Sequence, residues 1–158
     1  MYPPTTTTPW FNGVVSAFIM PLHIKPNKKP DRLPAGRILI LENDYSNRIL
    51  FADYLEQCGY SVCQLADEQK IFESLLACQP DVLMLNLKLP ILDGFSVIEQ
   101  LRSHPKWKKL AILVVSGYSL MSDRQKAYRS GADAYLVKPI LPADLSASVA
   151  HLIQSAVA

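Results

Sequence analysis

Residues 82–86 read Val-Leu-Met-Leu-Asn, a succession of four apolar side chains that stops at an amide. Two further runs of this kind occur along the chain, Ile38–Leu41 and Ala111–Val115. An uninterrupted apolar run of four or five residues is typical of a strand that is covered on both faces, whereas a half-exposed strand alternates. The three runs therefore predict the central strands of a sheet that lies between two layers of helices.

Two outer strands and five helices are predicted around these runs. Residues 60–65 alternate between polar and apolar, and residues 135–137 form a short apolar run. Between the strands, apolar residues recur at the spacing of amphipathic helices. The helical segments are marked by Ile49, Leu50, Ala52, Asp53 and Leu55 (start capped by Asp44 or Ser46); Ile71, Leu75 and Leu76 (capped by Asp67); Phe95, Ile98 and Leu101; the stretch from Ser122 to Gly131; and Leu145, Val149, Leu152, Ile153 and Ala156. Regular alternation of strand and helix predicts an α/β fold with a parallel sheet.

Polar residues stand directly after the first, third, fourth and fifth predicted strands. Glu42, Asn43 and Asp44 follow the first run, Asn86 follows the third strand, Ser116 and Gly117 the fourth, and Lys138-Pro139 the fifth. In open α/β sheets, ligands bind at the carboxyl ends of the strands. We therefore expect these side chains to form one small site. No histidine stands at a strand exit, so a catalytic triad is not expected and the chain is predicted not to be an enzyme.

The first 36 residues differ in composition from the rest. They hold seven of the 12 prolines and all four threonines, and proline blocks long helices and paired strands. The apolar run 14–22 is too short to span a bilayer, is interrupted by Pro21 and has no positively charged segment before it. We therefore predict a disordered N-terminal extension over 1–36, with a docking segment or a targeting signal as alternatives, followed by one domain over 37–158.

Charge and cysteine content narrow the classes of partner. The formal net charge is +2, but residues 1–36 carry four basic residues and one acid, which leaves the domain at −1. A near-neutral domain does not favour nucleic-acid binding, and no membrane segment is expected.

The remaining basic, histidine and cysteine residues are not grouped into a site. The basic stretch Lys106-Trp107-Lys108-Lys109 is interpreted as a solvated loop, and the scattered His23, His104 and His151 are interpreted as solvent or packing residues. Cys58, Cys63 and Cys78 form no CxxC pair, which predicts free thiols in a cytoplasmic protein and no zinc site.

The motifs around the strand exits resemble those of the receiver domain of two-component response regulators, over Arg37 to Ala156. In chain order they are Ile38-Leu-Ile-Leu-Glu-Asn-Asp44 with Asn47-Arg48, Asn86-Leu-Lys-Leu-Pro-Ile-Leu-Asp93-Gly94, Val115-Ser116-Gly117 and Gly131-Ala-Asp-Ala-Tyr-Leu-Val-Lys138-Pro139. Asn86 and Ser116 are 30 residues apart, and Ser116 and Lys138 are 22 apart. The resemblance implies a flavodoxin-like, doubly wound fold with five parallel strands in the order 2-1-3-4-5, five helices and a cis Lys138–Pro139 bond.

The resemblance also implies a chemistry that this sequence has lost in part. In the family, an acidic pair after the first strand and an aspartate after the third hold Mg²⁺, and that aspartate accepts a phosphoryl group from a histidine kinase. Here the acceptor position is Asn86 and the acidic pair reads Glu42-Asn43. The family's Ser/Thr, aromatic and lysine positions are kept as Ser116, Tyr135 and Lys138. We therefore expect weak or absent Mg²⁺ binding at a degenerate site of Glu42, Asn43 and Asn86.

Each retained residue also has a purely structural interpretation. Ser116 can satisfy backbone groups at a strand end, Lys138 can form a fixed ion pair with Glu42, and Tyr135 can be a core residue. Asp93-Gly94 is interpreted as a turn that leads into a helix.

The expected function is that of a stand-alone, atypical receiver domain in phosphorelay signalling, because the sequence ends with the fifth helix. It would bind a histidine kinase or another signalling protein, without phosphorylation at the usual site. The expected contact face consists of the fourth helix, the fifth strand and the fifth helix, with Tyr135 on it. Two alternatives stay open: a conventional phosphorelay receiver that uses Asp44 or Asp93, and a flavodoxin-like enzyme or cofactor binder. The second lacks a glycine loop after the first strand.

Overall fold

The computed structural model describes residues 35–157. Five parallel strands form one sheet in the order β2-β1-β3-β4-β5, as predicted. The strands are β1 (Arg37–Leu41), β2 (Ser61–Leu65), β3 (Val82–Leu85), β4 (Ala111–Ser116) and β5 (Ala134–Val137). The three uninterrupted apolar runs are β1, β3 and β4, at the centre of the sheet, and the two weaker strands lie at its edges. Burial on both faces thus explains the composition of the central strands.

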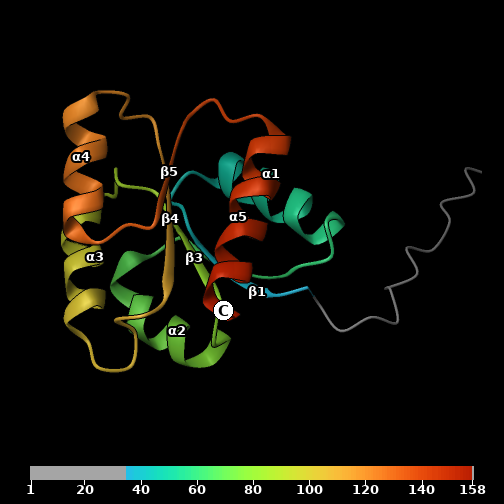
Figure 1. Cartoon of the computed structure of the whole chain (residues 1–158), viewed down its shortest axis with the longest axis horizontal. Coiled ribbons are helices and arrows are strands. Elements are labelled where there is room, and N and C mark those ends of the chain that lie inside the picture. Colours follow the sequence, from blue (N-terminus) through green and yellow to red (C-terminus); the bar gives the residue numbers. More distant parts are fainter. Residues whose placement is uncertain (1–34, 158) are drawn as a thin grey trace, which may run out of the picture. The chain divides into compact units, whose positions relative to one another are not determined.

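Five α-helices cover the two faces of the sheet (Figure 1). They are α1 (Tyr45–Gln57), α2 (Ile71–Cys78), α3 (Gly94–Ser103), α4 (Met121–Ser130) and α5 (Pro142–Val157), and a short 3₁₀ helix, η1 (Glu68–Lys70), precedes α2. In Figure 1, α1 and α5 lie on one side of the strands and α3 and α4 on the other. Because the strands are parallel, the loops that leave their carboxyl ends all lie at the same edge of the sheet.

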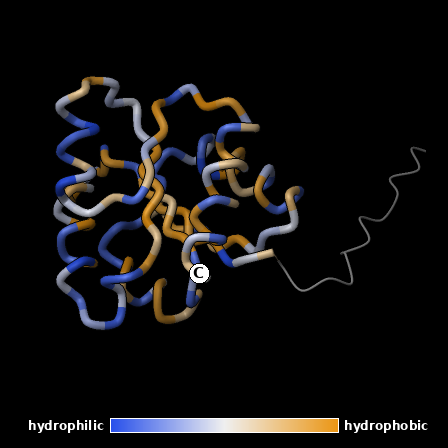
Figure 2. Tube along the Cα trace, in the orientation of Figure 1, coloured by the Kyte–Doolittle hydropathy of each residue, from blue (hydrophilic) through white to orange (hydrophobic). Residues whose placement is uncertain are grey.

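The core has two layers because side chains of a strand alternate between its faces. Ile38 and Ile40 pack with residues of α1 and α5, whereas Leu39 and Leu41 pack with residues of α2 and α3. Figure 2 shows the hydrophobic residues concentrated along the central strands. Both layers are continuous across β1, β3 and β4, which makes these strands a rigid base for the loops that follow them.

Short polar residues begin three of the helical segments. Asp44 is the N-cap of α1 and accepts a hydrogen bond from the Asn47 backbone N–H at 2.8 Å. Asp93 is the N-cap of α3, as the turn interpretation predicts. Asp67 caps η1 rather than α2 itself. The side-chain oxygen of each aspartate satisfies a backbone donor that the first turn leaves free. The Lys138–Pro139 peptide bond is cis, as the resemblance implied.

The predicted helical stripes are wrong at four positions, one of which is the exposed Asp53. Leu50 is 64% exposed, and Phe51 is buried in its place. Leu76 is 54% exposed, and Ala156 also faces solvent. The reason is geometric, since only one side of each helix contacts the sheet and these residues lie on the side that faces away from it.

The prediction of free thiols is wrong for two of the three cysteines. Cys63 of β2 and Cys78 at the end of α2 form a disulfide, with their Cα atoms 6.4 Å apart. Cys58 is free and exposed. The sequence contains no motif for this pair because the fold, and not local spacing, brings β2 and the end of α2 together.

Several smaller predictions concern the surface. Trp107 is buried, with Lys106 Nζ 4.8 Å from its ring centroid, and the lysines of that stretch are exposed, in keeping with a solvated loop. His104 is half-buried and His151 exposed. The predicted extension, apart from Ala35 and Gly36, and His23 lie outside the described residues. Within residues 35–157, no helix has the length and apolar character required to cross a bilayer.

Candidate functional site

The strand exits come together at one pocket, as expected for a parallel sheet. The pocket has a volume of about 390 Å³ and lies at the carboxyl edge of the sheet. Its lining residues are Glu42, Asn43, Asp44, Asn47, Asn86, Lys88, Leu89, Pro90, Gly117 and Lys138. Four separate loops contribute to this set, although the residues are far apart in the sequence. Ser116 and Tyr135 do not line it.

Glu42 is the buried carboxylate of the pocket, with 2% of its surface exposed. Lys138 Nζ lies 2.5 Å from its Oε2. Its Oε1 accepts hydrogen bonds from Asn86 Nδ2 and from the Asp44 backbone N–H, both at 3.0 Å. Lys138 and Glu42 thus form the ion pair on which the structural interpretation of Lys138 rests. Both carboxylate oxygens are engaged by donors within the protein, which is how a buried charge is accommodated.

The two amides complete a closed hydrogen-bond network. Asn86 Nδ2 also donates to the Lys88 carbonyl at 3.2 Å, and Asn86 Oδ1 accepts from the Lys88 backbone N–H at 3.3 Å. Asn43 Oδ1 can accept from Asn86 Nδ2 at 3.2 Å; with its amide turned over, Nδ2 donates instead to the Lys88 carbonyl at 3.1 Å and to Glu42 Oε1 at 3.3 Å. The second orientation gives the nitrogen two acceptors but also places it 3.2 Å from Asn86 Nδ2, which is itself a donor. Neither orientation adds an anion to the pocket.

The pocket is close to neutral in formal charge. Glu42 and Asp44 are opposed by Lys138 and by Lys88, which is exposed at the rim. The Asp44 carboxylate accepts from the start of α1 and lies beside the pocket rather than in its network. Within the part of the chain that the structure describes, no three His, Cys, Asp or Glu side chains are grouped so as to hold a metal ion. The Lys88 side chain was not anticipated, because a loop lysine two residues after Asn86 has no signature in the sequence.

Ser116 and Tyr135 both hold the backbone of one residue in the β4–α4 loop. Ser116 is fully buried, and its Oγ accepts from the Tyr118 backbone N–H at 3.1 Å. The Tyr135 hydroxyl donates to the Tyr118 carbonyl at 2.7 Å. Burial is the main cause that raises the pKa of Tyr135 above its ordinary value of 10.0. Both residues therefore make contacts of the kind that their structural interpretations predict.

Tyr135 is not on the exposed face where it was expected. Only 6% of its surface is exposed, and it packs in the core layer beneath α3 and α4. The physical reason is the pleat of β5, which directs Tyr135 to one face of the sheet and Leu136 to the other.

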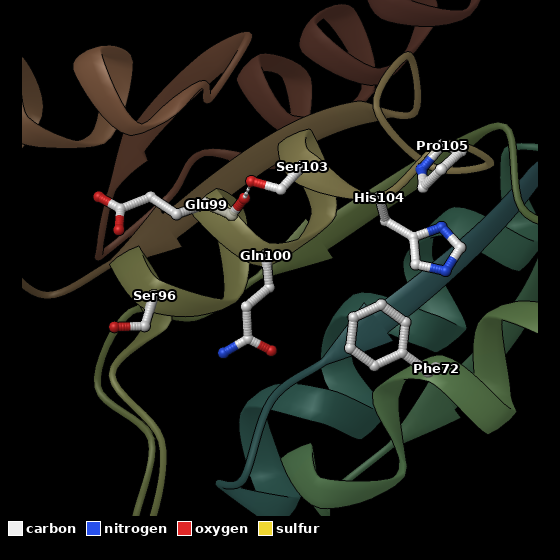
Figure 3. A pocket seen from close by; sticks show the side chains of 7 residues that line it. All are labelled: Phe72, Ser96, Glu99, Gln100, Ser103, His104 and Pro105. Atoms are coloured by element: carbon white, nitrogen blue, oxygen red, sulfur yellow. Dashed lines mark hydrogen bonds between the residues drawn. The ribbon is translucent and has the colours of Figure 1, made fainter.

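A second hollow lies on α2 and α3, away from the strand exits. It is a groove of about 540 Å³ (Figure 3). The rings of Phe72 and His104 pack next to each other in its lining, with their centroids 5.6 Å apart. The Ser103 hydroxyl donates to the carbonyl of Glu99 on the helix itself. His104 Nδ1 accepts from the Lys106 backbone N–H, and the Glu99 carboxylate accepts from Ser130. The serine, histidine and glutamate of the groove are therefore bonded to other groups and not to one another, and the candidate site remains at the strand exits.

Glu68 is a buried residue that the sequence did not single out. It is 2% exposed, and its Oε1 accepts from the backbone N–H groups of Ile91 and Leu92 at 2.6 and 3.2 Å. These amides belong to the β3–α3 loop, which lines the pocket through Lys88, Leu89 and Pro90. A glutamate in a polar stretch is usually exposed, so nothing in the local sequence could have found this contact.

This geometry agrees with what comparison with known proteins finds. Residues 38–150 match the model of the response regulator receiver domain. The chain is 35% identical over 118 residues to the DNA-binding dual master transcriptional regulator RpaA of Synechocystis, which covers 75% of this chain and 49% of RpaA. It is also 35% identical over 109 residues to a 14.6 kDa protein of Leptolyngbya boryana, covering 68% of this chain and 82% of that protein.

A solved structure supports the same assignment. The receiver domain of the sensor histidine kinase PA1611 from Pseudomonas aeruginosa, determined with a magnesium ion in its active-site cleft, is 27% identical with a TM-score of 0.69. The similarity covers 76% of this chain and 99% of that one. The chain belongs to the response regulator receiver family, whose members are signalling domains of two-component systems. It spans about half the length of the transcriptional regulators that it matches.

Proposed function

We propose that this receiver domain acts by binding other proteins and is not switched by phosphorylation at residue 86. The observation that carries the proposal is the amide of Asn86, which donates a hydrogen bond to Glu42 at the position where the family has its phosphoacceptor. An amide is a poor nucleophile and cannot give the acyl phosphate that a carboxylate gives. The site therefore lacks the group on which covalent switching depends.

The proposal extends to the metal ion. Mg²⁺ requires several oxygen ligands in octahedral geometry, and at least one or two of them are usually carboxylates. Glu42 is the buried carboxylate of the pocket, and Lys138, Asn86 and the Asp44 backbone already occupy its oxygens. A dication would have to displace Lys138, which supplies the compensating charge without any metal. We infer that Mg²⁺ binds weakly or not at all.

The neutral pocket supports a single conformation of the domain. Lys138 and Asn86 hold Glu42, and Ser116 and Tyr135 hold the Tyr118 backbone. A ligand shifts a conformational equilibrium only if it binds one state better, and here the group that would carry the phosphoryl is missing. We propose that the domain stays in one state and that its partners bind that state.

Exposed apolar side chains at the start of α4 and before α5 supply a surface for a protein partner. Met121 is 68% exposed, and Leu120 and Leu141 are similarly exposed. Tyr128, on α4, is also exposed. Large apolar side chains at the surface mark interaction sites when they gather on one face. We propose this α4–α5 face, without Tyr135, as the contact face for a histidine kinase or another signalling protein.

The phosphorylation part is tested with the full chain, Mg²⁺ and acetyl phosphate, by intact mass spectrometry. We expect no stoichiometric adduct, either in the wild-type protein or in the Asn86→Ala variant. An adduct that forms on the wild type and disappears in Asn86→Ala would overturn the proposal.

The same measurement tests the alternative acceptors. Asp44 and Asp93 are helix N-caps whose side-chain oxygens accept from backbone N–H groups. An adduct that persists in Asn86→Ala and maps to either aspartate would replace our proposal with that of a conventional phosphorelay receiver.

The binding part is tested by crosslinked capture of partners from an extract of the source cells. Met121→Asp should lose the captured protein, because a charge on an apolar contact face is costly to desolvate. Leu50→Asp, which changes an equally exposed leucine on α1, is the matched control and should capture as well as the wild type. Equal capture by both variants would show that the contact face lies elsewhere.

A further inference from the structure

The Cys63–Cys78 disulfide joins an edge strand to the end of a helix. Cys63 is half-buried in the middle of β2, and Cys78 is the buried last residue of α2. The two residues enclose a segment of the chain that contains η1 and α2. This segment is therefore closed into a covalent loop against the edge of the sheet.

The same segment holds the rim of the candidate site. Glu68 lies inside the loop that the disulfide closes, and its carboxylate accepts from the Ile91 and Leu92 backbone N–H groups. A buried carboxylate that accepts backbone hydrogen bonds fixes the position of those amides and has few alternatives in the folded protein. The disulfide thus closes the segment that carries Glu68, and Glu68 in turn contacts the β3–α3 loop.

Without the disulfide, few noncovalent contacts attach this segment to the rest of the domain. The helix α2 has eight residues, which is below the length at which an isolated helix is stable. Ile71 and Leu75 are its buried apolar residues besides Cys78, and Phe72 stacks on His104 at the groove (Figure 3). Segments with few buried contacts open locally more often than the core does.

We propose that the Cys63–Cys78 pair is a redox-sensitive tether that controls the mobility of the β3–α3 loop, with Glu68 as the positioning residue between them. A dithiol reductant supplies two electrons and two protons. Its thiolate attacks Cys63 Sγ, Cys78 leaves as a thiolate that takes up a proton, and the second thiol of the reductant then releases Cys63 as a thiol and closes its own disulfide. Oxidation by a disulfide such as oxidised glutathione reverses the exchange.

This coupling does not depend on the function proposed above. It concerns the mobility of the loop that lines the pocket and does not require residue 86 to be phosphorylated or unphosphorylated. Either proposal can fail while the other holds.

The bond itself is tested by counting thiols in the Cys58→Ser chain, whose exposed third cysteine would otherwise be labelled too. After incubation with oxidised glutathione, the protein is unfolded in a maleimide and weighed. We expect no labelled thiol, and two after treatment with dithiothreitol. Two labelled thiols, or two bound glutathiones, after the oxidising step would overturn the proposal.

The coupling is tested by hydrogen exchange of the full chain, oxidised and reduced. We expect the peptide that carries Ile91 and Leu92 to exchange about tenfold faster after reduction, because local opening of the segment releases these amides. The melting temperature should fall by about 10 °C, the scale expected when a loop of this length loses its cross-link. Unchanged exchange of this peptide in protein whose mass shows full reduction would overturn the coupling, whatever the melting temperature does.

The part of Glu68 is tested by Glu68→Ala, which removes the acceptor and leaves both cysteines in place. The oxidised variant should exchange at this peptide as fast as the reduced wild type, and reduction should add no more than about twofold. Glu68→Gln retains an acceptor oxygen and should largely preserve the slow exchange of the oxidised protein. Glu73→Ala, an exposed acid on α2, is the matched control and should respond to reduction like the wild type. A full response of Glu68→Ala to reduction would show that the tether does not act through Glu68.

Discussion

The central strands and the pocket at their carboxyl ends are built from neighbouring residues but depend on different interactions. Leu85 and Asn86 are adjacent and both buried, yet Leu85 packs among apolar side chains and Asn86 donates to a carboxylate. Apolar burial depends on volume and shape, whereas polar burial depends on matching each donor to an acceptor. The strands of a receiver fold are therefore compatible with amides in the pocket, because an asparagine has nearly the shape of an aspartate.

The largest expected effect comes from restoring charge to the pocket. The double change Asn43→Asp with Asn86→Asp should convert a protein with no phosphoryl adduct into one that labels close to stoichiometry with Mg²⁺ and acetyl phosphate. Asn86→Asp alone should label poorly, because a second carboxylate then faces Glu42 at the distance of the present 3.0 Å hydrogen bond without an added metal ligand. Intact mass spectrometry measures the phosphoryl labelling of the double and the single variant.

A matched control separates charge from position. Asn47→Asp with Asn86→Asp adds the same charge at another residue that lines the pocket. It should label no better than Asn86→Asp alone. Equal labelling of the single variant and the Asn43 double variant would show that residue 43 has no part in the loss of chemistry.

In the strands, the expected effect is one of stability alone. Leu83→Ala at the centre of β3 should lower the free energy of unfolding by about 3 kcal/mol, because the cavity is fully enclosed. Leu50→Ala on the exposed side of α1 should change it by less than about 0.5 kcal/mol. Urea unfolding measures both, and similar losses would mean that Leu50 is covered in solution.

Removing one partner of the ion pair should have an intermediate effect. Lys138→Met leaves the Glu42 carboxylate buried without its cation, and we expect a loss of about 2 kcal/mol in urea unfolding, below the range for fully buried pairs because Lys138 is partly exposed. Lys88→Met, at the rim of the same pocket, should have almost no effect. If Glu42→Gln does not recover part of the loss when combined with Lys138→Met, the unpaired charge is not its cause.

The smallest effect concerns the Tyr135 hydroxyl. Tyr135→Phe removes the hydrogen bond to the Tyr118 carbonyl and should cost about 1 kcal/mol, whereas Tyr128→Phe on the exposed side of α4 should cost little.

The same residue predicts a dependence on alkaline pH. Because burial raises the pKa of Tyr135 above 10.0, the folded state holds its phenolic proton more tightly than the unfolded chain does. Its contribution to stability is complete below pH 10 and is lost as the pH rises through the pKa of the folded state. Stability measured between neutral pH and pH 11 should therefore fall less steeply in Tyr135→Phe than in the wild type. Parallel curves would contradict this assignment.

The sequence predicts the strands well because their signal is local. Each central strand is an apolar run that can be read without knowledge of its neighbours. The runs of β1 and β3 end at Glu42 and Asn86, the polar residues that line the pocket. Helical stripes are less reliable, since Leu50 and Phe51 are equally apolar and only the sheet decides which of them is buried.

The contacts that the sequence could not predict all join distant segments. Cys63 and Cys78, and Glu68 and Ile91, approach one another only after β2, α2 and the β3–α3 loop have packed. In each case the sequence around one residue does not indicate which distant residue it will contact. The contact forms only because the packing of the whole domain brings the two residues together.

The outer strands of the sheet have a consequence for crowded solutions. β2 has five residues and β5 has four, so each offers few unpaired backbone groups along its free edge. Pro139, just beyond β5, has no N–H with which to extend the ladder. Long, flat strand edges invite a second chain to add and start aggregates. A sheet that ends in two such short edges should remain monodisperse at concentrations where a longer edge would seed fibrils.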